Sequence, residues 1–577
     1  MFRFIQKLPY FAVVVCWLFL FIATTSFASP PHPDIRDGVI AGKIAAPYFM
    51  EHIAEMHQKG ICTGDKSFFK NESIKGNAAS DAPKLSGQFK ALCILVDFSD
   101  KASQVNPVYF DSLLFSTSGS TVKAYYNEIS YGQLDLVTVN LPSSIGWIEA
   151  PQTYAYYVNG QNGTGNYPNN TQKLCEDVID AINGAINFSN YDNDGDGEMD
   201  CLIIAHSGQG AEYTGSNNDI WSHKWSIAPR VRDGVSISSY TIQPEYWRNP
   251  NDMTIGVYAH ELGHGFGLDD LYDLDGSSRG IGTWGIMSYG SWLGPNNRGG
   301  SPAHPCAFNR IKMGFAVPVI VATDSRDQQI EQVETGGNIY RLWTGGNISN
   351  EYFLVENRQQ VGFDSYLPGS GLMIWHIDEN MDANTYEWWP GKDSTFHYQV
   401  ALEQADGHFD LEIKYNYGDE GDPFPGERYK FDFNAVSTPS SNSYTNGVSY
   451  VMVTDISYSD SIMQADFTVG FSSTIPDPED PPQLPATLKL MQNYPNPFNP
   501  TTSISYSVSS NSLVKLEIYN IEGQRIRILV DELKEAGTYE VEWDGKNNSG
   551  IDVSSGIYLY RIISGYVTDS KKMILIR

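Results

Sequence analysis

The sequence has 577 residues, which exceeds the usual roughly 100–200 residues of one domain, so we expect several domains. Its formal net charge of −30 suits solubility and cation binding. The same charge disfavours a nucleic acid partner, because phosphate groups repel an acidic surface.

The start of the chain is typical of an export signal. Arg3 and Lys7 form a basic beginning, and Phe11–Ala23 is a nearly unbroken apolar run. Ser26–Ala28 offers small residues where signal peptidase reads them, so we predict cleavage after Ala28 and a secreted protein. An uncleaved membrane anchor is the alternative, because the apolar run approaches spanning length. We expect no membrane span after cleavage.

Residues 29–86 are typical of a pro-segment or linker, with a short helical stretch at Phe49–Lys59. Of the six cysteines, Cys16 lies in the signal, and the odd number that remains leaves at least one thiol unpaired. The sequence does not assign a disulfide pairing. The thiolate of Cys62, within the pro-segment, could cap a zinc ion; an unpaired residue or a structural disulfide are the alternatives.

The next region alternates between predicted strands and helices. Lys90–Phe98 and Cys201–Ala205 are compact apolar runs typical of buried strands, and Leu134–Val139 alternates like a half-exposed strand. Val122–Ile129 and Leu174–Ile186 have helical periodicity. This order predicts an α/β or α+β fold.

One loop between the second helix and the following strand carries acids at alternate positions around glycines. These acids are Asp192, Asp194, Asp196 and Asp200. The pattern is typical of a calcium site. Because Ile203 stands where an EF-hand has its bidentate glutamate, we predict a shorter structural calcium loop closed by Asp200. A solvated acidic turn is the alternative.

The most specific pattern begins at His260. His260 and His264 are four residues apart, which places both imidazoles on one helix face, where they can share a zinc ion. Glu261 is the expected general base, acting on a water molecule. An amphipathic helix whose histidines are merely polar is the alternative.

The third zinc ligand is expected from the turn after this helix. Gly267 allows the helix to end and the chain to turn back, which delivers Asp270 to the metal. Asp270 stands where the metzincin pattern has its third histidine, so we favour it over Asp269 and Asp273.

Trp284–Gly290 resembles the methionine-containing turn under the zinc ligands of metzincins. Met287 is the expected apolar floor of the site, with an ordinary core methionine as the alternative. Tyr289 is expected to bring its phenol near the metal, where it would stabilise the oxyanion of the transition state. The helix and the turn together predict a zinc-dependent peptidase.

Short alternating stretches follow, separated by Gly, Asn, Asp and Pro, and predict an all-β sandwich. They include Tyr352–Val355, Leu372–Ile377 and Tyr398–Leu402. Asp419 and Asp422, in a Gly-rich loop, could hold a second cation, and a plain turn is the alternative. After the stiff, acidic linker Ile475–Pro482, further alternation predicts a small Ig-like module. Its predicted strands are Thr501–Val508, Val514–Tyr519, Thr538–Trp543 and Gly556–Ile562.

Several segments together resemble the immune inhibitor A-like metallopeptidases, peptidase family M6. The segments are Lys90–Asp100, Tyr125–Gly132, Ile203–Trp225, the zinc motif through Asp273, Met287, Glu356–Gln359 and Leu402–Gly407. The resemblance implies zinc ligands at His260, His264 and Asp270, a base at Glu261, and protein or peptide substrates.

The end of the chain resembles a type IX secretion sorting domain. Gln492–Pro500 and Lys571–Arg577 carry that resemblance. It implies an outer-membrane secretion and sorting machinery as partner, followed by release, with or without removal of the domain, or attachment to the cell surface. The residues themselves indicate only a β-module with a basic end.

The sequence therefore predicts a multidomain, secreted zinc endopeptidase that hydrolyses extracellular proteins. The rival is a catalytically silent extracellular adhesin or binding protein with a peptidase-like domain. The predicted parts are a signal peptide at 1–28, a pro-segment or linker at 29–86, a catalytic domain at 87–328, a β-sandwich at 329–472, a linker at 473–486 and an Ig-like sorting domain at 487–577.

Overall fold

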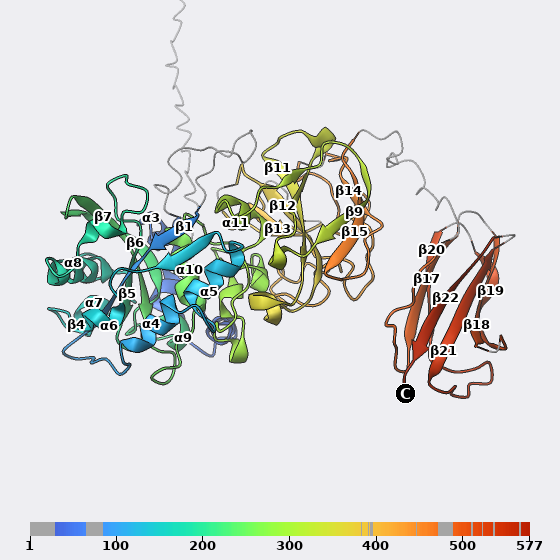
Figure 1. Cartoon of the computed structure of the whole chain (residues 1–577), viewed down its shortest axis with the longest axis horizontal. Coiled ribbons are helices and arrows are strands. Elements are labelled where there is room, and N and C mark those ends of the chain that lie inside the picture. The colour runs from blue at the N-terminus through green and yellow to red at the C-terminus, as the bar shows by residue number, and fades with distance from the viewer. Residues whose placement is uncertain are drawn as a thin grey trace, which may run out of the picture. The chain divides into compact units, whose positions relative to one another are not determined.

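The computed structural model describes residues 29–64, 85–470 and 489–577, apart from short gaps at 382, 391, 393–395, 446, 509–511, 522, 535–536 and 565–566. The chain forms two compact units, 1–471 and 472–577 (Figure 1). The predicted signal peptide and the acidic linker lie outside the described residues. Within the described ranges, no helix has the length and apolar character needed to cross a bilayer.

A five-stranded sheet organises the first half of unit 1, in the order β4-β2-β5-β7-β6. Its strands are β4 (Trp147–Glu149), β2 (Leu92–Asp97), β5 (Leu202–His206), β7 (Val235–Pro244) and β6 (His223–Arg232). All neighbours run parallel except β6, which is antiparallel to β7. Strands β2 and β5 confirm two predicted strands. Their sequences are apolar runs because strands of a parallel sheet are buried on both faces.

Helices surround this sheet. The predicted helix at Val122–Ile129 is α5, with the same bounds, and the hydroxyl of Thr121 caps it. The second predicted helix is α8 (Thr171–Ile182), which ends four residues before the predicted end. Strand β3 (Leu134–Val137) confirms the third predicted strand but pairs with β1 (Gly87–Lys90) outside the main sheet. The other helices are α4 (Val108–Phe115), α6 (Pro142–Ile145), α7 (Tyr154–Val158), α9 (Ala211–Thr214), α10 (Gly256–Gly265) and α11 (Ala307–Lys312).

The N-terminal segment 29–64 packs on this half of the molecule. It forms α1 (Pro33–Ile40), α2 (Tyr48–Glu51) and α3 (Ile53–Gln58), so the predicted helical stretch at Phe49–Lys59 is two short helices. Phe49, Met56 and Cys62 are fully buried and belong to the same hydrophobic core as the central sheet.

The second half of unit 1 contains two further sheets (Figure 1, yellow to orange). The first has the order β13 (Val400–Leu402), β12 (Gly371–Asp378), β11 (Glu351–Arg358), β10 (Tyr340–Leu342) and β8 (Val319–Ile320). The second has the order β14 (Met452–Thr454), β15 (Ile462–Thr468) and β9 (Ser325–Glu331). Apolar residues of both sheets, including Ile330, Phe353 and Phe467, share one buried cluster. Strands β11 and β12 are buried along their whole length.

Unit 2 is an all-β module around Trp543 and Tyr560. One sheet has the order β16 (Lys489–Leu490), β17 (Thr502–Val508) and β20 (Gly537–Trp543). The other has the order β19 (Arg525–Lys534), β18 (Ser512–Asn520), β21 (Gly556–Ser564) and β22 (Val567–Leu575). The four predicted strands are β17, β18, β20 and β21. Strands β19 and β22 were not predicted because charged residues interrupt their apolar pattern.

Candidate metal centre

Helix α10 carries the three residues of the predicted zinc helix, and it is buried along its whole length. His260, Glu261 and His264 are each 0% exposed. The helix ends at Gly265, and Gly267 adopts a φ of +84°, so the chain turns back as the sequence predicted.

The turn brings Asp270 to the two histidines. Asp270 Oδ1 lies 3.1 Å from His260 Nε2 and 3.3 Å from His264 Nε2. The opposite ring nitrogens are held by backbone carbonyls, at 2.8 Å each: His260 Nδ1 by Ile286 and His264 Nδ1 by Leu268. These carbonyls favour the tautomer in which both Nε2 lone pairs face inward.

The three side chains fit a zinc ion. Their potential ligand atoms all lie within 4.8 Å of one another. The buried Nε2 atoms of His260 and His264 have no hydrogen-bond partner, which a bound cation would supply. Two imidazoles and one carboxylate are a common donor set of catalytic zinc, which keeps one further position open.

The charged groups at this site influence one another strongly. Burial raises the pKa of Glu261, and the nearby histidines offset part of that effect. Burial opposes the charged form of His264, but Asp270 and Glu261 outweigh it and raise the pKa of His264 to about 9. Two buried carboxylates therefore favour positive charge at this position.

Tyr272 is a site residue that sequence reasoning missed. Its hydroxyl donates a hydrogen bond to Asp270 Oδ2 at 3.3 Å. The sequence offered a weak signal, an aromatic residue two positions after the predicted ligand, but nothing in the motif required a tyrosine there.

The predicted methionine turn lies beneath α10. Met287 is fully buried, and a Cβ added to Gly263 would lie 2.7 Å from Met287 Sδ, so sulfur and helix are in close contact. Tyr289 follows in a buried 3₁₀ turn, with its ring centroid 6.0 Å from that of Tyr272 and 4.6 Å from that of Tyr417.

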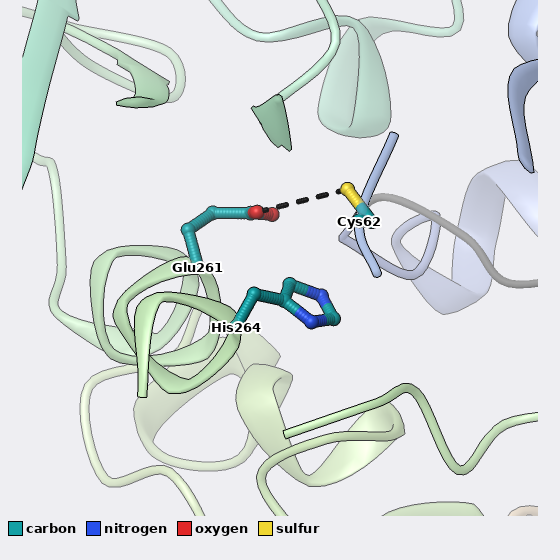
Figure 2. A group of neighbouring side chains, drawn as sticks. All are labelled: Cys62, Glu261 and His264. Carbon is teal, nitrogen blue, oxygen red and sulfur yellow. Dashed lines mark hydrogen bonds between the residues drawn. The ribbon is translucent and has the colours of Figure 1, made fainter. Parts of the chain in front are cut away.

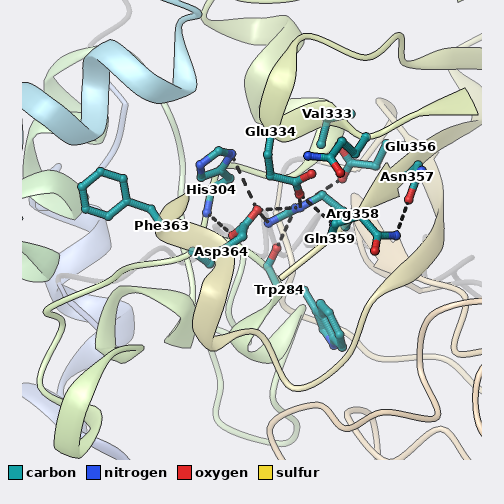
Figure 3. A network of polar contacts seen from close by, with 12 residues as sticks. Trp284, His304, Val333, Glu334, Glu356, Asn357, Arg358, Gln359, Phe363 and Asp364 are labelled. Carbon is teal, nitrogen blue, oxygen red and sulfur yellow. Dashed lines mark hydrogen bonds and ion pairs between the residues drawn. The ribbon is translucent and has the colours of Figure 1, made fainter. Parts of the chain in front are cut away.

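Two residues of the β-rich half of unit 1 contact Trp284, at the start of this turn, and Figure 3 shows one of them, Arg358. Trp284 Nε1 donates to Asp422 Oδ2 at 2.8 Å, and its carbonyl accepts a hydrogen bond from Arg358 at 3.4 Å. Arg358 is fully buried and also binds Asp364, at 2.7 Å. Neighbouring carboxylates outweigh the effect of burial and raise the pKa of Arg358. The other acids around it are Glu334 and Glu356.

The N-terminal segment reaches the same site. Ser29 donates two hydrogen bonds to Glu261 Oε1, from its backbone N at 3.0 Å and its hydroxyl at 2.6 Å. Cys62 Sγ lies 3.9 Å from Glu261 Oε2 (Figure 2). Burial, together with Glu261 and Asp270, raises the pKa of the Cys62 thiol. Cys62 and the four other cysteines that follow the predicted signal are free thiols.

Three of the four acids of the predicted calcium loop lie close together. Asp192, Asp194 and Asp200 place their oxygens within 4.8 Å of one another, and Asp196 is not in this group. Burial and the other two acids raise the pKa of Asp200 to about 6, although hydrogen bonds from Asn193 act in the opposite direction.

A second acidic loop surrounds Asp419 and Asp422. Asp422 is 1% exposed, and its Oδ2 accepts a hydrogen bond from Asp419 N at 3.1 Å. Asp406 Oδ2 and Asp419 Oδ1 would each lie 3.0 Å from a Cβ added at Gly421, so these two carboxylates face the same space.

Residues 108–315 match the family model of the immune inhibitor A peptidase M6 catalytic domain, and residues 498–564 match that of the FlgD Ig-like domain. Immune inhibitor A of Bacillus thuringiensis subsp. alesti is 29% identical over 260 residues, 36% of this chain and 36% of that protein. The pre-pro-metalloprotease PrtV of Vibrio cholerae serotype O1 is 30% identical over 258 residues, 36% of this chain and 27% of that protein. The matched region thus spans well under half of either relative.

The solved structures that match this chain include a bacterial FlgD. FlgD from P. aeruginosa has 21% sequence identity over 13% of this chain and 58% of that chain, with a TM-score of 0.11.

Proposed function

Because residues 108–315 form a catalytic domain of the M6 metallopeptidase family, we propose that this protein is a secreted zinc endopeptidase acting on extracellular proteins. The observation that carries the proposal is the convergence of His260, His264 and Asp270 beside Glu261. A silent adhesin would have no need for a buried set of zinc ligands next to a general base.

In the proposed mechanism, Glu261 takes a proton from the attacking water and passes it to the leaving amine. A zinc ion held by His260, His264 and Asp270 would polarise the scissile carbonyl and lower the pKa of the water. Burial excludes bulk solvent from Glu261 and raises its pKa, which suits a group that must both accept and donate the proton. Tyr289 is the proposed donor to the oxyanion, supported by its place next to Tyr272.

Glu261→Gln tests this mechanism. The amide keeps the size of the side chain but cannot accept the proton, so casein hydrolysis should fall by about 100-fold or more. Zinc content should stay unchanged, because Glu261 is not among the three proposed ligands. Retained hydrolysis in this variant would exclude Glu261 as the base. Hydrolysis by the wild type that a zinc chelator does not stop would exclude metal catalysis.

We also propose export across an outer membrane, with the C-terminal module as the sorting signal. The predicted signal peptide and the resemblance of the last residues to sorting domains support this proposal, and the Ig-like family match agrees with a separate module. Deleting residues 487–577 should leave the protein inside the cell envelope. Normal secretion of the shortened chain would contradict the proposal.

A structural calcium ion at Asp192, Asp194 and Asp200 is the last part of the proposal. The three acids come from one loop that joins α8 to strand β5, so a bound cation would fasten a central strand to the preceding helix.

A further inference from the structure

We propose that the β-rich half of unit 1, from β8 to β15, completes the zinc site, with Asn384 as the positioning residue of the ligand Asp270. This inference rests on the proposed zinc peptidase and adds residues that determine how firmly the metal is held. The contacts occur at two places, beside the third ligand and at the methionine turn, Trp284–Gly290.

The third ligand belongs to a segment with little regular structure. Helix α10 ends at Gly265, and the described residues 270–287 contain one regular element, the 3₁₀ turn Gly282–Trp284. An irregular segment lacks the hydrogen-bond ladder of a helix or a strand, so other parts of the protein must fix its side chains. The position of Asp270 therefore depends on what this segment packs against.

Both backbone polar groups of Leu271, the residue directly after the ligand, are engaged. Leu271 N donates to Met287 O at 2.8 Å, and Leu271 O accepts a hydrogen bond from Ile281 N at 3.0 Å. The same carbonyl also accepts a hydrogen bond from Asn384 Nδ2 at 3.0 Å. A carbonyl oxygen has two lone pairs, and here each has a donor. The peptide unit next to Asp270 is thus fixed by the methionine turn and by the β-rich half.

Asn384 is itself held by the five-stranded sheet of the β-rich half. It lies between β12 and β13 and is fully buried. Its Nδ2 donates to Val400 O at 2.8 Å, and its Oδ1 accepts a hydrogen bond from Val400 N at 3.0 Å. Val400 is the first residue of β13. Because a buried amide is costly to leave unpaired, these bonds keep the side chain in one orientation and tie Leu271 to the sheet.

The rest of the segment lies along the same half. Three of its backbone N–H groups donate to carbonyls of the β-rich half: Leu274 to Asn384 at 3.2 Å, Arg279 to Leu411 at 2.9 Å and Thr283 to Tyr417 at 2.8 Å. Each of these bonds satisfies a donor that an irregular segment cannot pair within itself. The chain between the third ligand and the methionine turn therefore takes its shape from the β-rich half.

The methionine turn is held from the same half. Arg358 donates to Trp284 O at 3.4 Å (Figure 3), and Trp284 Nε1 donates to Asp422 Oδ2 at 2.8 Å. Two residues later, Ile286 O accepts a hydrogen bond from His260 Nδ1 at 2.8 Å. A partner at this ring nitrogen fixes the orientation of a ligating histidine. The β-rich half thus acts on His260 as well as on Asp270.

The rate of zinc loss to a chelator tests Asn384 in the full-length chain without measuring proteolysis. Removing a residue that hydrogen-bonds to a metal ligand lowers metal affinity by about 10–100-fold. Asn384 acts one residue away from the ligand, so Asn384→Ala should lose zinc about 10-fold faster than the wild type, the lower end of that range.

Asn357→Ala is the matched control. Asn357 is another fully buried amide, and its Nδ2 donates to Ile330 O and Asp460 O at 2.9 Å each, both within the β-rich half. Both variants should lower the stability of the protein, but Asn357→Ala should lose zinc at the wild-type rate. Equal rates of zinc loss in Asn384→Ala and Asn357→Ala would overturn the proposal.

Combination with Asp270→Ala shows whether Asn384 acts through this ligand. Asn384→Ala should then cause no further loss of zinc affinity, because the side chain that it positions is gone. Effects that multiply would show that Asn384 acts elsewhere. The visible absorption of bound cobalt(II), which reports ligand geometry, should change in Asn384→Ala and not in Asn357→Ala. A wild-type spectrum in Asn384→Ala would contradict the positioning role.

A second pair of variants covers the case in which Asn384→Ala does not fold. Trp284 and Trp375 are both fully buried, and each indole N–H donates to a buried carboxylate, that of Asp422 at 2.8 Å and that of Glu356 at 2.9 Å. Trp375 lies in β12, outside the methionine turn. Trp284→Phe should therefore lose zinc faster than Trp375→Phe, and equal rates would contradict the proposal.

The zinc content of the wild type separates this inference from the proposed function. If the wild type binds no zinc, the proposed peptidase and the positioning role fail together. If the wild type binds zinc and Asn384→Ala loses it no faster, only the positioning role fails.

Discussion

Asp269 Oδ2 lies 2.9 Å from Lys312 Nζ, although Asp269 directly precedes the candidate ligand Asp270. Its other oxygen accepts a hydrogen bond from Gly64 N at 3.0 Å. Burial raises the pKa of Asp269, but Lys312 outweighs burial and the net pKa is lowered. Asp269 is thus paired with a residue of α11, whereas Asp270 lies next to the two histidines. This difference distinguishes two candidate ligands that are adjacent in the sequence.

The first prediction concerns the third ligand. Asp270→Ala should lower zinc affinity by at least about 10–100-fold. Changing a residue that only hydrogen-bonds to a metal ligand already causes a loss of that size. Asp269→Ala should keep its zinc, because its partner is Lys312. Asp273→Ala should keep zinc as well, since Asp273 groups with Asp275 and Glu387 instead. Zinc content after dialysis measures this, and loss of zinc from either control would contradict the assignment.

The second prediction concerns calcium. An ion that binds only the folded protein adds about 2.7 kcal/mol of stability at 100 times its dissociation constant. Added calcium should therefore raise the unfolding temperature of the wild type but not that of Asp194→Asn. Glu149→Gln, which removes one exposed charge at the end of β4, is the control and should respond like the wild type. An unchanged response in Asp194→Asn would remove this loop as the binding site.

The third prediction concerns the close contact between Gly256, in α10, and the backbone of Ser291. A Cβ added at Gly256 would lie 1.9 Å from the carbonyl oxygen of Ser291, so Gly256→Ala should destabilise the protein by about 1–3 kcal/mol. Gly265, in the same helix, has its nearest neighbour at 3.8 Å. Gly265→Ala should be neutral or stabilising, by up to about 1 kcal/mol. Urea unfolding measures both, and equal effects would show that the contact with Ser291 does not limit the packing.

The fourth prediction is a pH dependence caused by Asp422. Burial and the nearby Asp419 and Asp406 raise the pKa of Asp422 to about 8, although the hydrogen bond from Trp284 acts against this. Between about pH 4 and 8 the folded state therefore holds a proton that the unfolded state has lost. Without divalent cations, Asp422 should thus lower stability as the pH rises, by up to about 1.4 kcal/mol per unit.

Asp422→Asn checks the sign of this effect. The amide cannot ionise, so the free energy of unfolding should depend less on pH across this range than in the wild type. An unchanged slope would contradict the assignment. A cation held by Asp419 and Asp422, the sequence-based alternative to a plain turn, would reverse the slope because it favours the ionised carboxylates.

The sequence pattern predicted the bounds of an element well where neighbouring residues determine them. The helix at Val122–Ile129 has its predicted bounds because Thr121 supplies a cap directly before the apolar period. The hairpin of β6 and β7 was not predicted, since its outer strand is half exposed and its sequence does not alternate strictly. In the predicted calcium loop, alternate spacing alone did not separate Asp196 from the three acids that gather.

The sequence by itself determined which residues are candidates for the metal site. The four-residue spacing of His260 and His264 and the glycine of the turn are properties of a helix and its C-cap, which depend on neighbours in the chain. Only the tertiary structure decided the rest. It placed Asp270 next to the two histidines while pairing Asp269 with Lys312, and it brought Cys62 to Glu261 from 199 positions away. Such contacts arise from the packing of elements that are distant in the sequence, so the hydrophobic periodicity of a segment does not predict them.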